Sequence, residues 1–120
     1  MEKSMPLNIR MEGDLAILSH FGSLLNDPRH FDASRDLKEL LEHGYRNVIL
    51  DLRGVREMGA TSMGLLTTLT RLVRQQGGEV VLANANHGTK DFIEMMRMDA
   101  YWDLFDSLEE AKSFYRRVPN

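Results

Sequence analysis

Two neighbouring hydroxyl groups, those of Thr61 and Ser62, are the side chains of this sequence best suited to chemistry. They lie in the stretch Ala60–Gly64, an imperfect relative of the Gly-x-Ser-x-Gly elbow, which holds a nucleophilic serine on a sharp turn from strand to helix. The elbow follows its strand at once, whereas about ten residues separate Ser62 from Leu52, the end of the preceding apolar run. The spacing therefore argues against a nucleophile.

A base that would activate either hydroxyl is also missing from the pattern. His87 is the only histidine after Ser62, and orienting its ring would need Asp91 or Asp99, for which the spacing offers no support. This disfavours a small hydrolase acting through Ser62. We expect no catalytic residue and no enzymatic activity, and we expect Ser62→Ala to leave any activity largely intact.

Metal and cofactor sites find no support in the sequence. The four histidines occur singly and never four residues apart, the spacing that places two ligands on one helical face, and the chain has no cysteine. Gly77 and Gly78 lack the lysine and the hydroxyl residue of a phosphate-binding loop, so a helix stop explains them. We expect neither a metal nor a cofactor.

Length and charge narrow the classes of function further. A chain of 120 residues fits one domain, and its net charge of -3 provides no basic field for nucleic acid. No stretch approaches the roughly 20 apolar residues that span a membrane, and Met1–Pro6 lacks the apolar core of a signal peptide. The absence of cysteine fits a reducing compartment. We expect a cytoplasmic protein, neither exported nor membrane-integral, that does not bind nucleic acid.

The hydrophobic pattern predicts an α/β domain with a mixed sheet of four or five strands and about four helices. Strands that alternate with helices imply parallel pairing, and an opening hairpin adds an antiparallel strand. Val48–Leu52 should be central, because its apolar run shows no polar alternation. The predicted elements are a hairpin of Leu7–Met11 and Leu15–Phe21, a helix Pro28–His43, a strand Asn47–Leu52, a helix Ser62–Gln76, a strand Glu79–Asn84, a helix Thr89–Met98, a strand Trp102–Phe105 and a helix from the capping box Ser107–Glu110 to about Arg116.

The segment between the central strand and the central helix carries the most information. Asp51–Val55 reads Asp-Leu-Arg-Gly-Val after a buried strand, and Gly64–Leu66 lies in the first turns of the long helix. These stretches resemble the STAS family, in which a strand ending in Asp-Leu-x-x-Val is followed by Asp-Ser-Ser-Gly-Leu-Gly at the start of the central helix. The resemblance covers Leu7–Tyr115. It implies one STAS-like domain over residues 5–118, of the kind found in bacterial anti-sigma factor antagonists.

The resemblance also implies a phosphorylation switch, from which this chain departs. In family members that antagonise anti-sigma factors, the first serine of the motif is phosphorylated, but Ala60 stands at that position and Gly59 replaces the preceding aspartate. Thr61 matches the second hydroxyl position and Ser62 replaces a glycine, so both are candidate phosphoacceptors. Thr61 is preferred because it stands at the predicted helix start, where the dipole favours an anion. Either hydroxyl can instead simply cap the helix, and Ser62 can lie on its buried face.

The partner-binding surface implied by the resemblance is the loop and helix start around Gly59–Gly64 together with the polar side of the helix. A regulatory protein is the implied partner, possibly an anti-sigma factor serine kinase, and a homodimer is also compatible. The alternative is a constitutive, unphosphorylated accessory subunit of an ATPase such as a lipid-transport ABC system, which the altered motif fits. The predicted contact residues are Gly59, Ala60, Thr61, Ser62, Met63, Arg71 and Arg74.

Three methionines near the end of the third predicted helix form a further candidate contact surface. Met95, Met96 and Met98 carry thioethers, which repack easily against different partners. Helical spacing also allows an ordinary structural use. We expect two of the three to pack in the core.

Overall fold

A computed structural model of the chain describes residues 8–19, 30–56 and 58–117. The predicted helix opening at Pro28, the strand end at Phe21 and the proposed domain limits at residues 5 and 118 lie outside these ranges. Within them, no helix is both long enough and apolar enough to cross a membrane.

The structure has a single five-stranded mixed sheet, in agreement with the prediction. The strands stand side by side in the order of the sequence, β1-β2-β3-β4-β5, so that β3 is central. β1 and β2 form the antiparallel hairpin, and every later pairing is parallel. The strands are β1 (Asn8–Glu12), β2 (Leu15–Ser19), β3 (Asn47–Asp51), β4 (Glu79–Ala83) and β5 (Leu104–Phe105).

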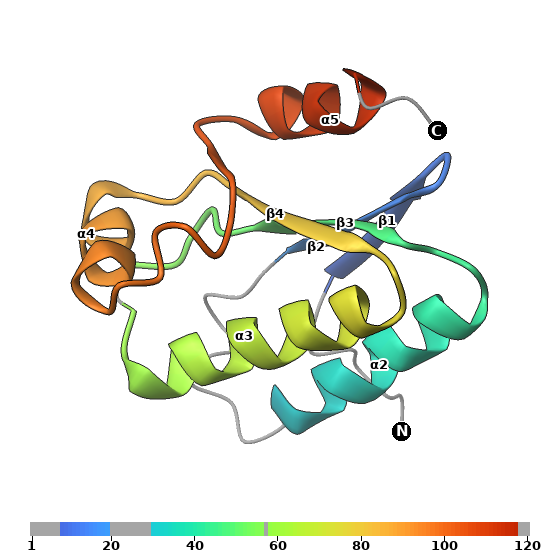
Figure 1. The fold of residues 1–120 in the computed structure, drawn as a ribbon, viewed down its shortest axis with the longest axis horizontal. Helices are drawn as coiled ribbons and strands as arrows, with labels where there is room; N and C mark the ends of the chain where they lie inside the picture. Colours follow the sequence, from blue (N-terminus) through green and yellow to red (C-terminus); the bar gives the residue numbers. More distant parts are fainter. Residues whose placement is uncertain (1–7, 20–29, 57, 118–120) are drawn as a thin grey trace.

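The described helices lie on both faces and at one end of the sheet. α2 (His30–Glu42) and α3 (Ala60–Gln75) cover one face, and α5 (Leu108–Arg117) lies over the other (Figure 1). α4 (His87–Met95) stands at the end of the sheet where the parallel strands finish. The fold therefore has three layers, with α2 and α3 on one side of the sheet and α5 on the other.

Residues of the central strands alternate between two hydrophobic clusters, because successive side chains of a strand point to opposite faces. Val48 and Leu50 are fully buried with Leu69 of α3 in the larger cluster, between the sheet and the helix pair α2 and α3. Ile49 is fully buried with Ala111 of α5 in the smaller cluster, on the opposite face. The apolar run without polar alternation did indicate a strand covered on both faces.

Several boundaries differ from the prediction, and the strand predicted over Trp102–Phe105 is shortened to Leu104–Phe105. α3 begins at Ala60, two residues before the predicted Ser62. α4 begins at His87 instead of Thr89, because the Asn86 side chain caps the helix by accepting from the Thr89 N–H at 2.7 Å. α4 also ends at Met95 and not at Met98. At α5 the capping box is confirmed, since Ser107 Oγ accepts from the Glu110 N–H at 3.1 Å.

Candidate protein-interaction site

The route from β3 to α3 is fixed by a buried carboxylate. Asp51, the last residue of β3, is 7% exposed, and its Oδ1 accepts from the Arg53 N–H at 3.1 Å and from Asn84 Nδ2 at 2.9 Å. The Leu52 N–H also donates to the Ala83 carbonyl at 2.9 Å. The ends of β3 and β4 are therefore tied together just before the chain turns toward α3.

A single asparagine connects this turn with α4. Asn86 uses its Oδ1 to cap α4, and its Nδ2 donates to the Val55 carbonyl at 2.9 Å. Val55 is itself buried in the larger cluster. Asn86 consequently ties Val55, four residues before Gly59, to the start of α4.

The N-terminus of α3 has no side-chain cap, which contradicts the expectation that Thr61 or Ser62 caps it. Gly59 occupies the N-cap position with φ -129° and ψ -171°, and no side-chain hydrogen bond caps the helix. Its carbonyl accepts from the Met63 N–H at 2.9 Å, so Thr61 and Ser62 are already the second and third helical residues. Their side chains therefore lie past the position from which a hydroxyl caps.

The structure divides the predicted contact residues into exposed and buried sets. Gly59, Ala60 and Thr61 are exposed. Ser62 and Met63 are only 8% and 5% exposed, so their side chains face the interior and not solvent. The accessible part of the helix start is thus smaller than the sequence indicated.

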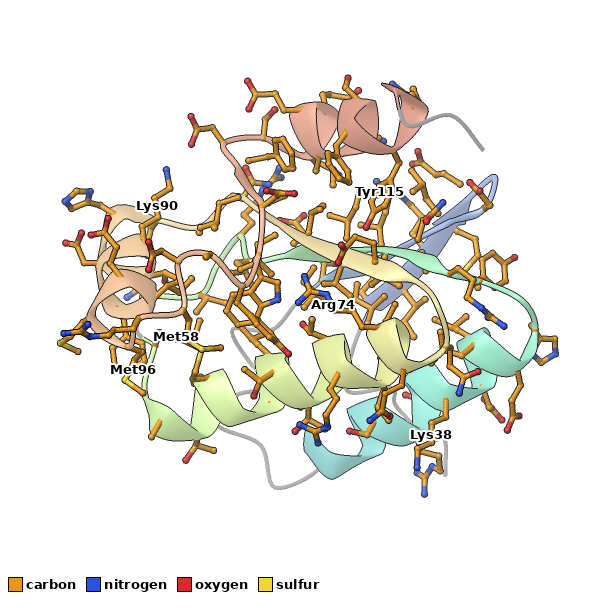
Figure 2. The ribbon with its side chains drawn as sticks, viewed as in Figure 1. Lys38, Met58, Arg74, Lys90, Met96 and Tyr115 are labelled. Atoms are coloured by element: carbon orange, nitrogen blue, oxygen red, sulfur yellow. The ribbon has the colours of Figure 1, made fainter. Side chains whose placement is uncertain are left out.

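The two arginines have different surroundings. Arg71 is exposed, as expected for a contact residue. Arg74 Nε instead pairs with Glu79 Oε1 at 2.8 Å, its Nη2 donates to the Tyr101 carbonyl at 2.7 Å, and its guanidinium lies 4.7 Å from the centre of the Tyr101 ring. Figure 2 shows Arg74 between α3 and the sheet. Arg74 thus links α3 to the segment before β5 and contributes little accessible charge.

The described residues do not surround Ser62 with groups that would activate it. Of the histidine side chains that are described, His43 Nδ1 donates to the Glu39 carbonyl at 2.8 Å and His87 lies 3.4 Å from Asp91. Neither ring bonds to Ser62, and no group of three or more His, Asp or Glu side chains in the described ranges is arranged to hold a metal.

Gly64 occupies an open position, and the methionines near the end of α4 are more exposed than expected. Gly64 is exposed in the second turn of α3, and the space where a Cβ would stand has no atom within 4 Å. Met95 and Met96 are 68% and 45% exposed, and only Met98 packs against the larger cluster, so the expected burial of two methionines is wrong. α4 ends at Met95, and Arg97, two residues later, adopts a left-handed φ of 60°, which is unusual for a residue other than glycine or asparagine.

Proteins of similar sequence and solved structures of similar fold are known. A protein of Thermotoga maritima named "Putative anti-sigma factor antagonist" is 23% identical over 104 residues, which are 87% of this chain and 92% of that protein. The anti-sigma factor antagonist SpoIIAA in its unphosphorylated form has the same fold, with a TM-score of 0.73 at 18% identity, over 95% of this chain and 99% of that one. SpoIIAA in its phosphorylated form gives a TM-score of 0.66 at 15% identity, over 92% and 99%. The STAS domain model matches residues 28–111, and the chain therefore belongs to the STAS domain family.

Proposed function

We propose that this chain is a regulatory module that binds an anti-sigma factor through the exposed side of the first half of α3. The relatives named as anti-sigma factor antagonists support this class of function. The observation that carries the choice of surface is Gly64, because the fold itself gives no reason for a glycine there.

Gly64 weakens the helix in which it lies. A glycine in a helix interior costs about 1 kcal/mol relative to alanine. No neighbouring atom approaches the position of a Cβ at residue 64, so packing within the chain does not require the glycine. Ala60 and Thr61, one turn earlier on the same side, are also small and exposed. A surface without large side chains allows the backbone of a partner to approach α3 closely, which is the use we propose for Gly64.

Calorimetric titration with each purified anti-sigma factor of the source organism tests the proposal. Gly64→Leu should weaken the binding by about tenfold or more, because a bulky side chain separates two closely packed surfaces. Gly64→Ala should raise the free energy of unfolding by about 0.5–1 kcal/mol while still weakening the complex. Gln75→Leu, which adds the same side chain at the exposed far end of α3, is the matched control and should bind as the wild type does. Unchanged affinity of Gly64→Leu would refute the proposed surface.

We further propose that Thr61 carries the regulatory phosphate if the module is switched. Ala60 offers no hydroxyl and Ser62 is buried, whereas Thr61 is exposed in the first turn of α3, where backbone N–H groups and the dipole stabilise an anion. Thr61→Glu should then weaken the complex, while Thr61→Ala should preserve it. Mass spectrometry after incubation with the cognate kinase should find one phosphate in the wild type and none in Thr61→Ala.

The second candidate is a constitutive module that is never phosphorylated, for example an accessory subunit of a transport ATPase. Ala60 favours it, since the residue at the usual acceptor position cannot accept a phosphoryl group. Equal affinities of wild type, Thr61→Ala and Thr61→Glu, together with no detected phosphate, would support this candidate and contradict the Thr61 switch.

A further inference from the structure

Positive charge is concentrated in one segment of this acidic chain. Residues 52–78, which include α3 and the loop before it, contain four arginines and one acidic residue, Glu57. The whole chain, by contrast, has 15 lysines and arginines against 18 aspartates and glutamates. α3 itself contains neither aspartate nor glutamate. The charge of the chain is therefore polarised along the sequence, and the helix of the proposed contact belongs to the positive part.

Three of the four arginines in this segment are available to a partner. Arg53, Arg56 and Arg71 are exposed. Among the residues that the structure describes, none forms a hydrogen bond or an ion pair with the guanidinium group of any of these three. The fourth, Arg74, is already paired with Glu79. The three exposed guanidinium groups thus have donors that the described fold does not use.

Arg71 lies on the same side of α3 as Gly64. The two positions are seven residues apart, almost two full turns of an α-helix, and therefore share one face. Helical side chains lean toward the N-terminus, so the long Arg71 side chain can reach back toward Gly64. Thr68, which lies between them on this face, is small and half-buried. Gln75 lies a further turn toward the C-terminus, beyond this reach.

We infer that this surface, the basic α3 face formed by Arg53, Arg56, Gly64 and Arg71, recognises an acidic patch on the protein partner. The inference rests on the proposed contact of α3 and specifies the chemistry of what it binds. Carboxylates of the partner pair with Arg71 on one side of the close approach at Gly64 and with the loop arginines on the other. Arginine can bind a carboxylate through two parallel N–H donors, which fixes orientation as well as charge.

The negative charge elsewhere on the molecule restricts an acidic partner to this face. The chain has a net charge of -3. α4, at the end of the sheet from which α3 starts, carries Asp91 and Glu94. These groups repel an acidic patch, whereas the basic α3 face attracts it, so the charges orient the two proteins as they meet.

A second copy of this chain and a nucleic acid both fit the basic α3 face less well. A symmetric dimer through α3 would bring the same arginines of the two copies together. Nucleic-acid binding draws on many phosphate contacts, but residues 52–78 contain no lysine and only three arginines without a described partner. A few carboxylates on a protein surface match a charge of this size.

Nuclear magnetic resonance titration of the whole chain with a synthetic probe tests the inference. The probe is a blocked hexaglutamate peptide, and its counterpart is blocked hexalysine. At low ionic strength hexaglutamate should shift the amide signals of residues 53–56 and of the exposed side of α3, despite the negative charge of the protein. The shifts should diminish at about 0.5 M salt, because exposed charges are screened. Hexalysine should leave the same signals unchanged.

Charge reversal at Arg71 separates this face from a general effect of net charge. Arg71→Glu should weaken the binding of hexaglutamate by about threefold to tenfold, since an attractive charge becomes repulsive. Arg116→Glu is the matched control, because it makes the same change at an exposed residue of α5, over the opposite face of the sheet; it should bind as the wild type does. Equal losses in the two variants, or shifts centred on another surface, would overturn the inference. Tighter binding of a DNA hexamer to α3, or self-association of the free protein through α3, would also overturn it.

Titrations with anti-sigma factors distinguish this inference from the proposed function. Arg71→Glu should weaken any complex that Gly64→Leu weakens, while Arg116→Glu should preserve it. If Gly64→Leu weakened the complex and Arg71→Glu did not, the contact on α3 would stand and its acidic complement would be refuted. If no anti-sigma factor bound but hexaglutamate still bound at Arg71, the proposed partner would be wrong and the acidic complement would stand.

Discussion

Two buried threonines differ in whether the side-chain hydroxyl has a hydrogen-bond partner, and this difference affects the stability of the fold. Thr70 is fully buried in α3, where its Oγ1 donates to the Leu66 carbonyl at 2.8 Å and accepts from Trp102 Nε1 at 2.8 Å. Thr89 is 1% exposed in α4, yet its Oγ1 has no hydrogen-bond partner. Burying a hydroxyl without a partner costs free energy, whereas a bonded hydroxyl recovers that cost.

We therefore expect the same substitution to have opposite effects at the two threonines. Thr70→Val should lower the free energy of unfolding by about 1–3 kcal/mol, because the Trp102 indole loses its acceptor. Thr89→Val should leave the stability unchanged or raise it by up to about 1 kcal/mol, since the Thr89 N–H that donates to Asn86 is retained. Urea denaturation of both variants measures the difference. A loss at Thr89 as large as that at Thr70 would show that the Thr89 hydroxyl is bonded.

Side-chain roles were predictable only where the helical period decides them. The period placed Ser62 on the buried stripe of α3, and it is 8% exposed. The same period placed Arg74 on the polar side, but its bonds reach Glu79 and Tyr101, which are 5 and 27 residues away in the sequence. Only the packing of β4 and of the segment before β5 brings these groups to Arg74.

Two glycines with different surroundings lie near α3, one in its second turn and one just beyond its end. Gly64 has open space around it, but a Cβ on Gly78 would overlap the Arg46 carbonyl oxygen and lie 2.7 Å from Val73 Cγ1. The Glu79 N–H also donates to the Arg46 carbonyl at 3.0 Å, so the chain entering β4 cannot easily move away.

Gly78→Ala should consequently lower the free energy of unfolding by about 1–3 kcal/mol or more, the usual cost of overpacking against backbone. Gly64→Ala, the same change 14 positions earlier, should have the opposite sign. Thermal and urea denaturation of the two variants provide the comparison. If Gly78→Ala were as stable as the wild type, the junction of α3 and β4 would be looser than the structure shows.

Element types were predicted better than their starts, and the capping residues explain why. Serine and threonine are favoured N-cap residues, which is consistent with the predicted start of α3 at Ser62. In the structure, Gly59 occupies the N-cap position in an extended backbone conformation, and no side chain caps the helix. Asn86 is an equally favoured cap, but it lies among residues typical of loops, so the sequence alone does not mark it as a helix start. Choosing between such candidates requires the tertiary contacts, here the bond from Asn86 to the Val55 carbonyl.

For the whole molecule, α5 is the described helix that covers the second face of the sheet, and a few polar contacts attach it there. The Tyr115 hydroxyl lies 2.7 Å from the Val48 carbonyl and 2.8 Å from the Glu79 carbonyl, at the starts of β3 and β4 (Figure 2). Lys112 Nζ pairs with Glu12 Oε1 of β1 at 2.8 Å and with Glu109 Oε2 at 3.4 Å. These contacts join the last helix to the first hairpin and to the central strands.

The sequence predicted the capped helix α5 but not its attachment to β1. The sequence pattern indicates an ordinary surface lysine at position 112 of a polar helix, although the Lys112 side chain is only 9% exposed. Its partner Glu12 belongs to the opening hairpin, 100 residues earlier in the sequence. No local pattern connects the two, because their contact depends on the order of strands in the sheet.

The ion pair between Lys112 and Glu12 should make stability depend on pH at both extremes. The hydrogen bond from Lys112 lowers the pKa of Glu12 below 4.5, and the hydrogen bond to Glu12 raises the pKa of Lys112 above 10.5. The contribution of Glu12 is present above pH 4.5 and is lost as the pH falls through its lowered pKa. The contribution of Lys112 is present below pH 10.5 and is lost as the pH rises through its raised pKa.

Lys112→Met should therefore be less stable than the wild type across the neutral range, and the difference should shrink in strong acid and in strong base. Urea denaturation of both proteins at a series of pH values measures it. Lys90→Met is the matched control, because Lys90 pairs with Asp106 at the same distance of 2.8 Å but the two side chains are 42% and 79% exposed. An exposed pair contributes little, so Lys90→Met should stay close to the wild type at neutral pH. If Lys112→Met instead followed the wild type at every pH, the contact between α5 and β1 would contribute nothing to holding the helix on the sheet.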